Sequence, residues 1–216
     1  MEICLLFMGL YGIVDWHSWP LVSPLLEQTL GLMDFTDQQM TAKFAAFEAE
    51  QDPTLVYEAL DLIEATERSL PAGDTATRKQ ALSRRLRFFV ALDRTIDPTW
   101  NPENIPVRGV SPPLTHGIVY SSGEVDAATI PDPAVRAEYE RALKASKDYE
   151  RWYNMQFQLR RIDERAMRFV ERLLAERYTK SEEDRQEFEA LLAVSSVDEQ
   201  RKARLRELIL KHAREH

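Results

Sequence analysis

The first candidate site is an aspartate–histidine pair near the start of the chain. Asp15 and His17 alternate along the sequence, so both side chains would point to the same side of an extended segment. A carboxylate and an imidazole can supply two ligands to a metal ion, and Asp34 or Asp37 is the nearest source of a third. Two ligands do not define a site. We therefore interpret this stretch as an aromatic-rich connection in which His17 hydrogen-bonds locally, and we predict no metal site.

A second set of reactive residue types lies in the proline-rich stretch. His116 is followed by Ser121, Ser122 and Asp126, which together are the residue types of a nucleophilic triad. A nucleophile elbow needs a strand–turn–helix around the serine, and the surrounding sequence does not resemble one. The pattern favours a polar turn. The candidate polar cluster of the chain consists of Asp15, His17 and His116.

Four arginines form the third candidate, and we call them the arginine stripe: Arg161, Arg165, Arg168 and Arg172. Gaps of four, three and four residues place them on one face of a helix. Guanidinium groups bind carboxylate and phosphate groups well. Three interpretations stay open: a solvated face with ion pairs one turn away, a contact with the acidic first half of the chain, or a site for an anionic ligand or partner.

The element that must position the arginine stripe is a helix predicted over residues 133–177. Asp132 is a good N-cap, Pro133 suits the first helical position, and neither proline nor glycine follows. Apolar and small residues recur at gaps of three and four in two runs, Val135, Tyr139, Ala142, Ser146, Tyr149, Tyr153 and Leu159, Ile162, Ala166, Phe169, Leu173. Between the runs, aromatic residues surround most of the helix, which predicts a buried centre of the domain. Base stacking by these aromatics is the less favoured alternative.

Helix start signals predict further helices on both sides of this one. Before it we expect helices over residues 24–32, 36–50, 53–70 and 75–95, the second starting at a Thr36–Gln39 capping box. After it we expect one that starts behind Ser181 and one from a Ser196–Glu199 capping box to about Arg214. The predicted fold is an all-α domain of about seven helices around the long helix.

The loop over residues 98–132 separates the two helical parts. Residues 98–133 contain seven of the eleven prolines and three of the seven glycines, which excludes a helix. The pieces 107–110 and 118–120 have strand-like composition and could form a short β-ribbon. Its apolar content predicts that the loop wraps the surface. One compact domain would thus contain acidic hairpins over 1–97, the wrapping loop, and three helices over 133–216.

Composition narrows the class of protein. Hydrophobic residues make up 44% and charged residues 30%, which is typical of a soluble globular chain. The net charge is −8, with a balance of −10 over residues 1–133 and +2 over 134–216, so specific nucleic-acid binding is not expected. A single cysteine, Cys4, excludes an intrachain disulfide and a thiolate metal cluster.

The apolar stretch 3–14 leaves the compartment open. It is too short to span a bilayer and lacks the basic start and the cleavage site of an export signal. We favour a buried first element in a cytoplasmic protein, with an export signal or a peripheral membrane contact as alternatives.

The sequence carries no catalytic, metal or nucleotide signature. We therefore expect a non-enzymatic protein–protein interaction module without cofactors, whose partner is another protein or a second copy. The alternative is an enzyme or a small-ligand or metal-binding protein, with its site between the Asp15–His17 segment and the proline-rich loop.

Overall fold

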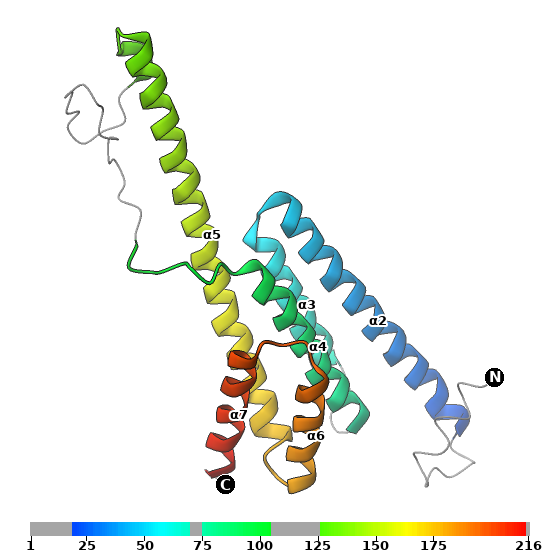
Figure 1. The fold of residues 1–216 in the computed structure, drawn as a ribbon. Coiled ribbons are helices and arrows are strands. Elements are labelled where there is room, and N and C mark those ends of the chain that lie inside the picture. Colours follow the sequence, from blue (N-terminus) through cyan, green and yellow to red (C-terminus); the bar gives the residue numbers. More distant parts are fainter. Residues whose placement is uncertain (1–18, 70–74, 105–125, 215–216) are drawn as a thin grey trace.

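The structure is a computed structural model of the chain, and it describes residues 19–69, 75–104 and 126–214 (Figure 1). Within these ranges there are six α-helices, one short 3-10 helix and no strand. The all-α class is confirmed. The residues predicted to form a β-ribbon lie outside the described ranges, so the ribbon stays a prediction. The elements are α2 (Trp19–Glu50), α3 (Pro53–Ser69), α4 (Thr75–Thr95), η1 (Ala127–Thr129), α5 (Pro133–Arg177), α6 (Glu182–Val194) and α7 (Glu199–Arg214).

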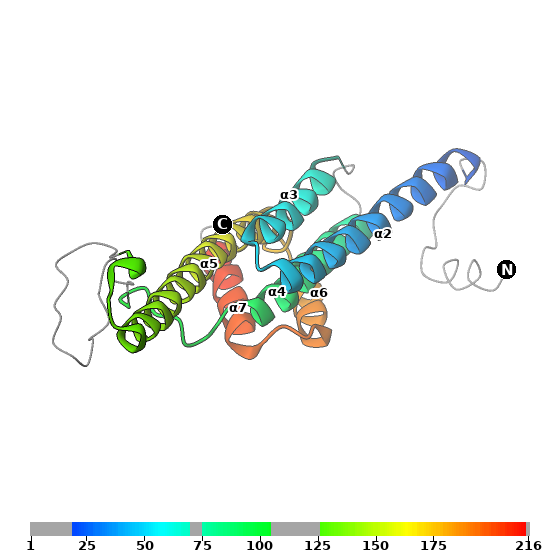
Figure 2. The same cartoon turned by 90° about the horizontal axis from the view of Figure 1, so that it is seen from above.

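The long helix α5 has the bounds that the sequence predicts. The Asp132 carboxylate accepts a hydrogen bond of 2.8 Å from the backbone N–H of Ala134, so it satisfies an otherwise unpaired donor of the first turn. At 45 residues the helix is roughly 68 Å long. Figures 1 and 2 show that only its C-terminal half lies among the other helices, while its N-terminal half extends beyond them.

Helix α2 corrects the prediction of two separate helices over 24–32 and 36–50. It is continuous from Trp19 to Glu50, so Thr36 lies inside it and is no cap. The Thr36 hydroxyl is buried and lies 3.0 Å from the hydroxyl of Thr66 on α3. Packing against α3 overrides the local start signal, and the described ranges therefore hold six α-helices instead of seven.

The main core lies where the C-terminal half of α5 meets α3, α4, α6 and α7, and α2 adds the buried Met40, Phe44 and Phe47 to it. Fully buried side chains come from each helix from α3 to α7 and include Leu60, Phe89, Ile162, Phe188 and Leu205. A small second cluster of Ile130, Val135 and Tyr139 packs η1 against the start of α5. The part of α5 at the centre of the main core is thus the segment from Leu159 onward, and not the aromatic segment before it.

Helix α7 begins at Glu199, so Ser196 lies too early to be its N-cap. The Asp198 carboxylate accepts a 3.0 Å hydrogen bond from the backbone N–H of Arg201, which makes Asp198 the cap in place of Ser196. The apolar face of α7, with Leu205 and Ile209, is folded into the core.

Candidate functional site

The four arginines of the arginine stripe do not share one role. Arg165 points to α3, where its Nη2 lies 2.6 Å from Asp61 Oδ1 and 3.0 Å from Glu64 Oε2. The hydrogen bond with Glu64 is the main reason why the pKa of Arg165 is raised. Arg161, Arg168 and Arg172 are exposed on α5. One member thus contacts the acidic first half, and a role of the other three in binding an anion or partner stays a prediction.

The candidate polar cluster cannot be placed. Asp15, His17 and His116 lie outside the described residues, as do Ser121 and Ser122 of the triad-like set. Asp126 is described, and it caps η1 by accepting a 3.0 Å hydrogen bond from the backbone N–H of Ala128. Over residues 19–69, 75–104 and 126–214, no group of three or more His, Cys, Asp or Glu side chains could hold a metal ion.

Arginines of α4 join this helix to its neighbours. Arg85 forms a buried ion pair with Glu67 of α3 and donates a 2.6 Å hydrogen bond to the backbone carbonyl of Phe169 on α5. Burial raises the pKa of Glu67 and lowers that of Arg85, with each partner opposing the shift of the other. Arg78 lies 2.7 Å from Asp184 and 3.0 Å from Glu187, both of α6. These buried and half-buried charges join neighbouring helices.

A polar depression of about 740 Å³ lies between α4, α5 and α7, around Arg201. The Arg201 Nη1 is 2.6 Å from Asp163 Oδ1, and its Nε is 3.1 Å from each oxygen of Asp93. The guanidinium carbon also lies 4.3 Å from the ring centroid of Phe89. Arg201 of α7 therefore contacts side chains of both α4 and α5.

Two carboxyl groups in this depression have pKa values shifted in opposite directions. Burial raises the pKa of Asp93, with Asp198 beside it adding to the shift. Burial alone would raise the pKa of Asp198 too, but hydrogen bonds from the Arg201 backbone and from Asp93 lower it. Such a pair can be an acid–base pair. Here both oxygens of Asp93 are directed at Arg201, so the arrangement is better explained as a structural ion pair.

The most distinctive surface is an aromatic cluster where α5 leaves the body. We call it the aromatic junction, and it consists of Trp100, Tyr149, Trp152, Tyr153 and Phe157. Ring centroids of Trp100 and Tyr153 are 5.5 Å apart, and those of Trp100 and Phe157 are 6.4 Å apart. Tyr153 is buried, whereas Tyr149 is 41% and Phe157 45% exposed. The prediction of a fully buried aromatic centre is therefore wrong for two of these residues.

The segment before this junction crosses α5 as two consecutive turns. We call residues 97–104 the strap. The backbone N–H of Trp100 donates to the Asp97 carbonyl at 3.2 Å, and that of Asn104 donates to the Asn101 carbonyl at 3.1 Å. Each turn starts with Asp or Asn followed by proline, residue types that favour the first two turn positions.

Polar side chains from one face of α5 hold the backbone of the strap. The hydroxyls of Tyr149 and Tyr153 donate to the carbonyls of Asn104 and Pro102, at 3.1 and 3.0 Å. Gln156 is buried and accepts a 2.8 Å hydrogen bond from the backbone N–H of Asp97. The positions 149, 153 and 156 are one helical turn apart each, so a single face of α5 binds the strap.

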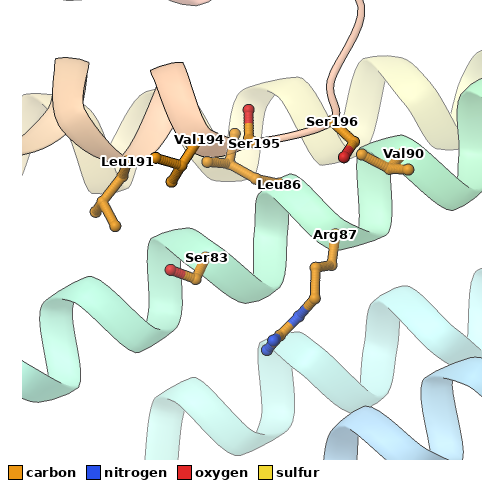
Figure 3. A pocket seen from close by; sticks show the side chains of 8 residues that line it. All are labelled: Ser83, Leu86, Arg87, Val90, Leu191, Val194, Ser195 and Ser196. Atoms are coloured by element: carbon orange, nitrogen blue, oxygen red, sulfur yellow. The ribbon is translucent and has the colours of Figure 1, made fainter.

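A small apolar groove runs between α4 and α6 (Figure 3). Its volume is about 290 Å³, and its apolar lining consists of Leu86 and Val90 of α4 and Leu191 and Val194 of α6. Val194 is 83% exposed. The groove offers apolar surface, but no chemical group in it identifies an occupant.

Sequence reasoning missed the strap and the ion pairs of Arg201. The strap had a detectable signal, since Asp97-Pro98 and Asn101-Pro102 repeat a turn motif after four residues. The ion pair of Arg201 with Asp93 had no such signal, because the two residues are 108 residues apart.

Comparison with protein-family models, with curated proteins and with solved structures finds no match to this chain.

Among the helices that the structure describes, none combines the length and the apolar character needed to cross a bilayer.

Proposed function

We propose that this chain is a non-catalytic helical protein that binds another protein, and that the aromatic junction is the centre of the contact. The observation that carries the proposal is the exposure of Tyr149 and Phe157 next to the rings of Trp100 and Trp152. Tryptophan and tyrosine are the residues most enriched among those that dominate binding energy at protein interfaces.

The junction is also held in place before any partner arrives. The Tyr149 hydroxyl is fixed by the Asn104 carbonyl, and the Tyr153 ring packs against Trp100. Side chains that are already ordered lose less conformational entropy on binding. The described charged groups with shifted pKa values, by contrast, serve ion pairs and helix ends, which supports a binding role over a catalytic one.

Site-specific crosslinking tests the proposal. A photoreactive phenylalanine analogue at position 157 is expected to crosslink a distinct protein in native lysate. The matched control is the same analogue at position 35, because Phe35 on α2 is also exposed, at 54%. The Trp152→Ala variant should reduce the adduct formed at position 157.

Two results would contradict the proposal. Identical adducts at positions 157 and 35 would show that crosslinking reflects exposure alone. Adducts that contain only this chain would show that the surface binds a second copy of the chain and not a different protein.

The alternative, an enzyme or ligand-binding protein, depends on Asp15, His17 and His116. These residues lie outside the described ranges, and the alternative stays a prediction.

A further inference from the structure

We propose that the α5 rings of the aromatic junction, those of Tyr149, Tyr153 and Phe157, recognise a protein segment in which an aromatic side chain lies beside Asx-Pro turns, Asx being Asp or Asn. The strap would then occupy this surface in cis, as a stand-in for the partner segment. The inference rests on the proposed function and names the chemistry of the partner.

The first argument is the place of Trp100. It is the aromatic residue of the strap, and its ring centroid lies 5.5 Å from that of Tyr153 and 6.4 Å from that of Phe157. The Arg160 guanidinium lies 5.9 Å from the same ring. An aromatic ring, supplied from outside α5, is therefore already seated on the face that we propose as the contact.

The second argument is that α5 binds the strap mainly through its backbone. Tyr149 donates to the Asn104 carbonyl, Tyr153 to the Pro102 carbonyl, and Arg160 to the Asp97 carbonyl at 3.3 Å. Carbonyl groups are present in every peptide, so these donors can bind another segment with the same turn geometry. The turn geometry and the aromatic ring of a segment, and not its remaining side chains, determine whether it binds.

The third argument is that few side chains of the strap are buried. Pro98, Thr99 and residues 101–104 are exposed, and Asp97 and Trp100 are half-buried, which leaves the Trp100 ring as the main apolar anchor of the strap. Segments with few buried apolar contacts open at a small fraction of the global unfolding free energy. A partner can therefore displace the strap without unfolding the body.

The turns also make the segment a good ligand. Side-chain oxygens of Asp97 and Asn101 accept hydrogen bonds from the backbone N–H groups of Thr99 and Glu103, at 2.8 and 2.9 Å. Together with the prolines they order each turn locally, which lowers the entropic cost of binding.

The test uses the full chain and a labelled synthetic peptide of residues 97–104, Asp-Pro-Thr-Trp-Asn-Pro-Glu-Asn. In the wild type the strap competes in cis, at an effective concentration on the order of millimolar. Trp100→Ala removes the anchor of the strap. Fluorescence anisotropy should show that the peptide binds this variant at least about ten-fold more tightly than it binds the wild type.

Two controls separate this site from non-specific binding. Replacing Tyr149 and Tyr153 by phenylalanine in the Trp100→Ala background removes two donors, and each loss should weaken peptide binding by about five-fold. Phe35→Ala should leave binding as in the wild type. If Trp100→Ala loses its helical circular dichroism, the Pro98→Gly and Pro102→Gly double variant releases the strap instead.

Three results would overturn the proposal. The first is a peptide that binds the released variants no more tightly than the wild type, and the second is a peptide with alanine for tryptophan that binds equally well. A wild-type dimer that Trp100→Ala dissociates, measured by sedimentation velocity, would assign the surface to a second copy. Peptide binding needs no natural partner, so its outcome is independent of the crosslinking at position 157.

Discussion

At the scale of single residues, the buried charges decide how the helices pack. Arg85 lies between Glu67 and the backbone carbonyl of Phe169, and its guanidinium carbon is 3.5 Å from the ring centroid of Phe169. An unpaired charge at this depth would be costly, so each partner requires the other. The pair therefore fixes how α3, α4 and α5 meet.

The Arg85–Glu67 pair gives the first prediction. Glu67→Ala leaves Arg85 buried without its carboxylate and should lower the free energy of unfolding by about 3–5 kcal/mol, measured by urea denaturation. The double variant Glu67→Leu with Arg85→Met buries no charge and should regain most of that loss. A single variant as stable as the wild type would show that the pair contributes little.

Tyr178 gives a pH prediction. Burial raises the pKa of its hydroxyl above the ordinary value, and the nearby negative charge of Glu187 adds to the shift. Above a pH of about 10 the unfolded chain loses this proton while the folded chain keeps it, so stability falls as pH rises. The slope should reach about 1.4 kcal/mol per pH unit, measured by denaturation between about pH 9 and pH 11.

Tyr178→Phe is the control for this slope. The variant has no hydroxyl to ionise, so its stability should fall less steeply over the same pH range. Equal slopes for wild type and variant would show that Tyr178 ionises normally in the folded chain.

At the scale of elements, helix starts were predictable where local chemistry decides them. Asp132 was predicted as a cap, and it accepts a hydrogen bond from the first turn of α5, as Asp52 does from the first turn of α3. Asp198 was missed because Ser196 offered a competing local signal. Which of two nearby caps is used depends on how α7 is held, and Arg201 holds it against α4 and α5.

The cap of α7 gives a prediction that separates the two candidates. Asp198→Ala should lower the free energy of unfolding by about 1 kcal/mol, because a backbone donor loses its acceptor. Ser196→Ala should change it by less than about 0.5 kcal/mol. Asp198→Asn keeps an oxygen acceptor and should stay near the wild type, as measured by thermal or urea denaturation.

A larger loss of stability for Ser196→Ala than for Asp198→Ala would show that Ser196 and Glu199 cap α7, as the sequence predicts. Since Asp198 also lies beside Asp93, the asparagine variant shows how much of the effect comes from charge instead of capping.

At the scale of the whole molecule, α5 has two halves with different surroundings (Figure 1). The C-terminal half contributes Leu159, Ile162, Val170 and Leu174 to the main core. Before the aromatic junction, the N-terminal half contributes Val135 and Tyr139, with the partly buried Leu143, to the small cluster with η1. One helix thus joins a packed body to an extension that has few buried contacts among the described residues.

This difference predicts uneven hydrogen exchange along α5. Amides of residues 140–150 should exchange at least about ten-fold faster than those of 160–172, because local opening costs less where few apolar contacts are lost. Exchange measured by mass spectrometry checks this, with α3 as a protected reference. Uniform protection along the helix would show that the extension is as well packed as the body.

The fold was more predictable than the candidate site. The start and end of α5 were given by Asp132 and by periodicity, whereas the Thr36 signal failed because Thr66 pairs with Thr36 from α3. The arginine stripe was recognisable as a stripe, but only the position of Glu64, 101 residues away, decided that Arg165 is used inside the molecule.

The helical character of the chain and the bounds of its longest helix could be predicted without a structure. These properties depend on caps, prolines and periodic apolar residues within a few turns, and such interactions are local. The exposure of Tyr149 and Phe157, and the burial of Tyr153 beneath Trp100, became apparent from the tertiary structure. Burial depends on which distant segments reach a helix face, and the periodicity of that helix holds no information about them.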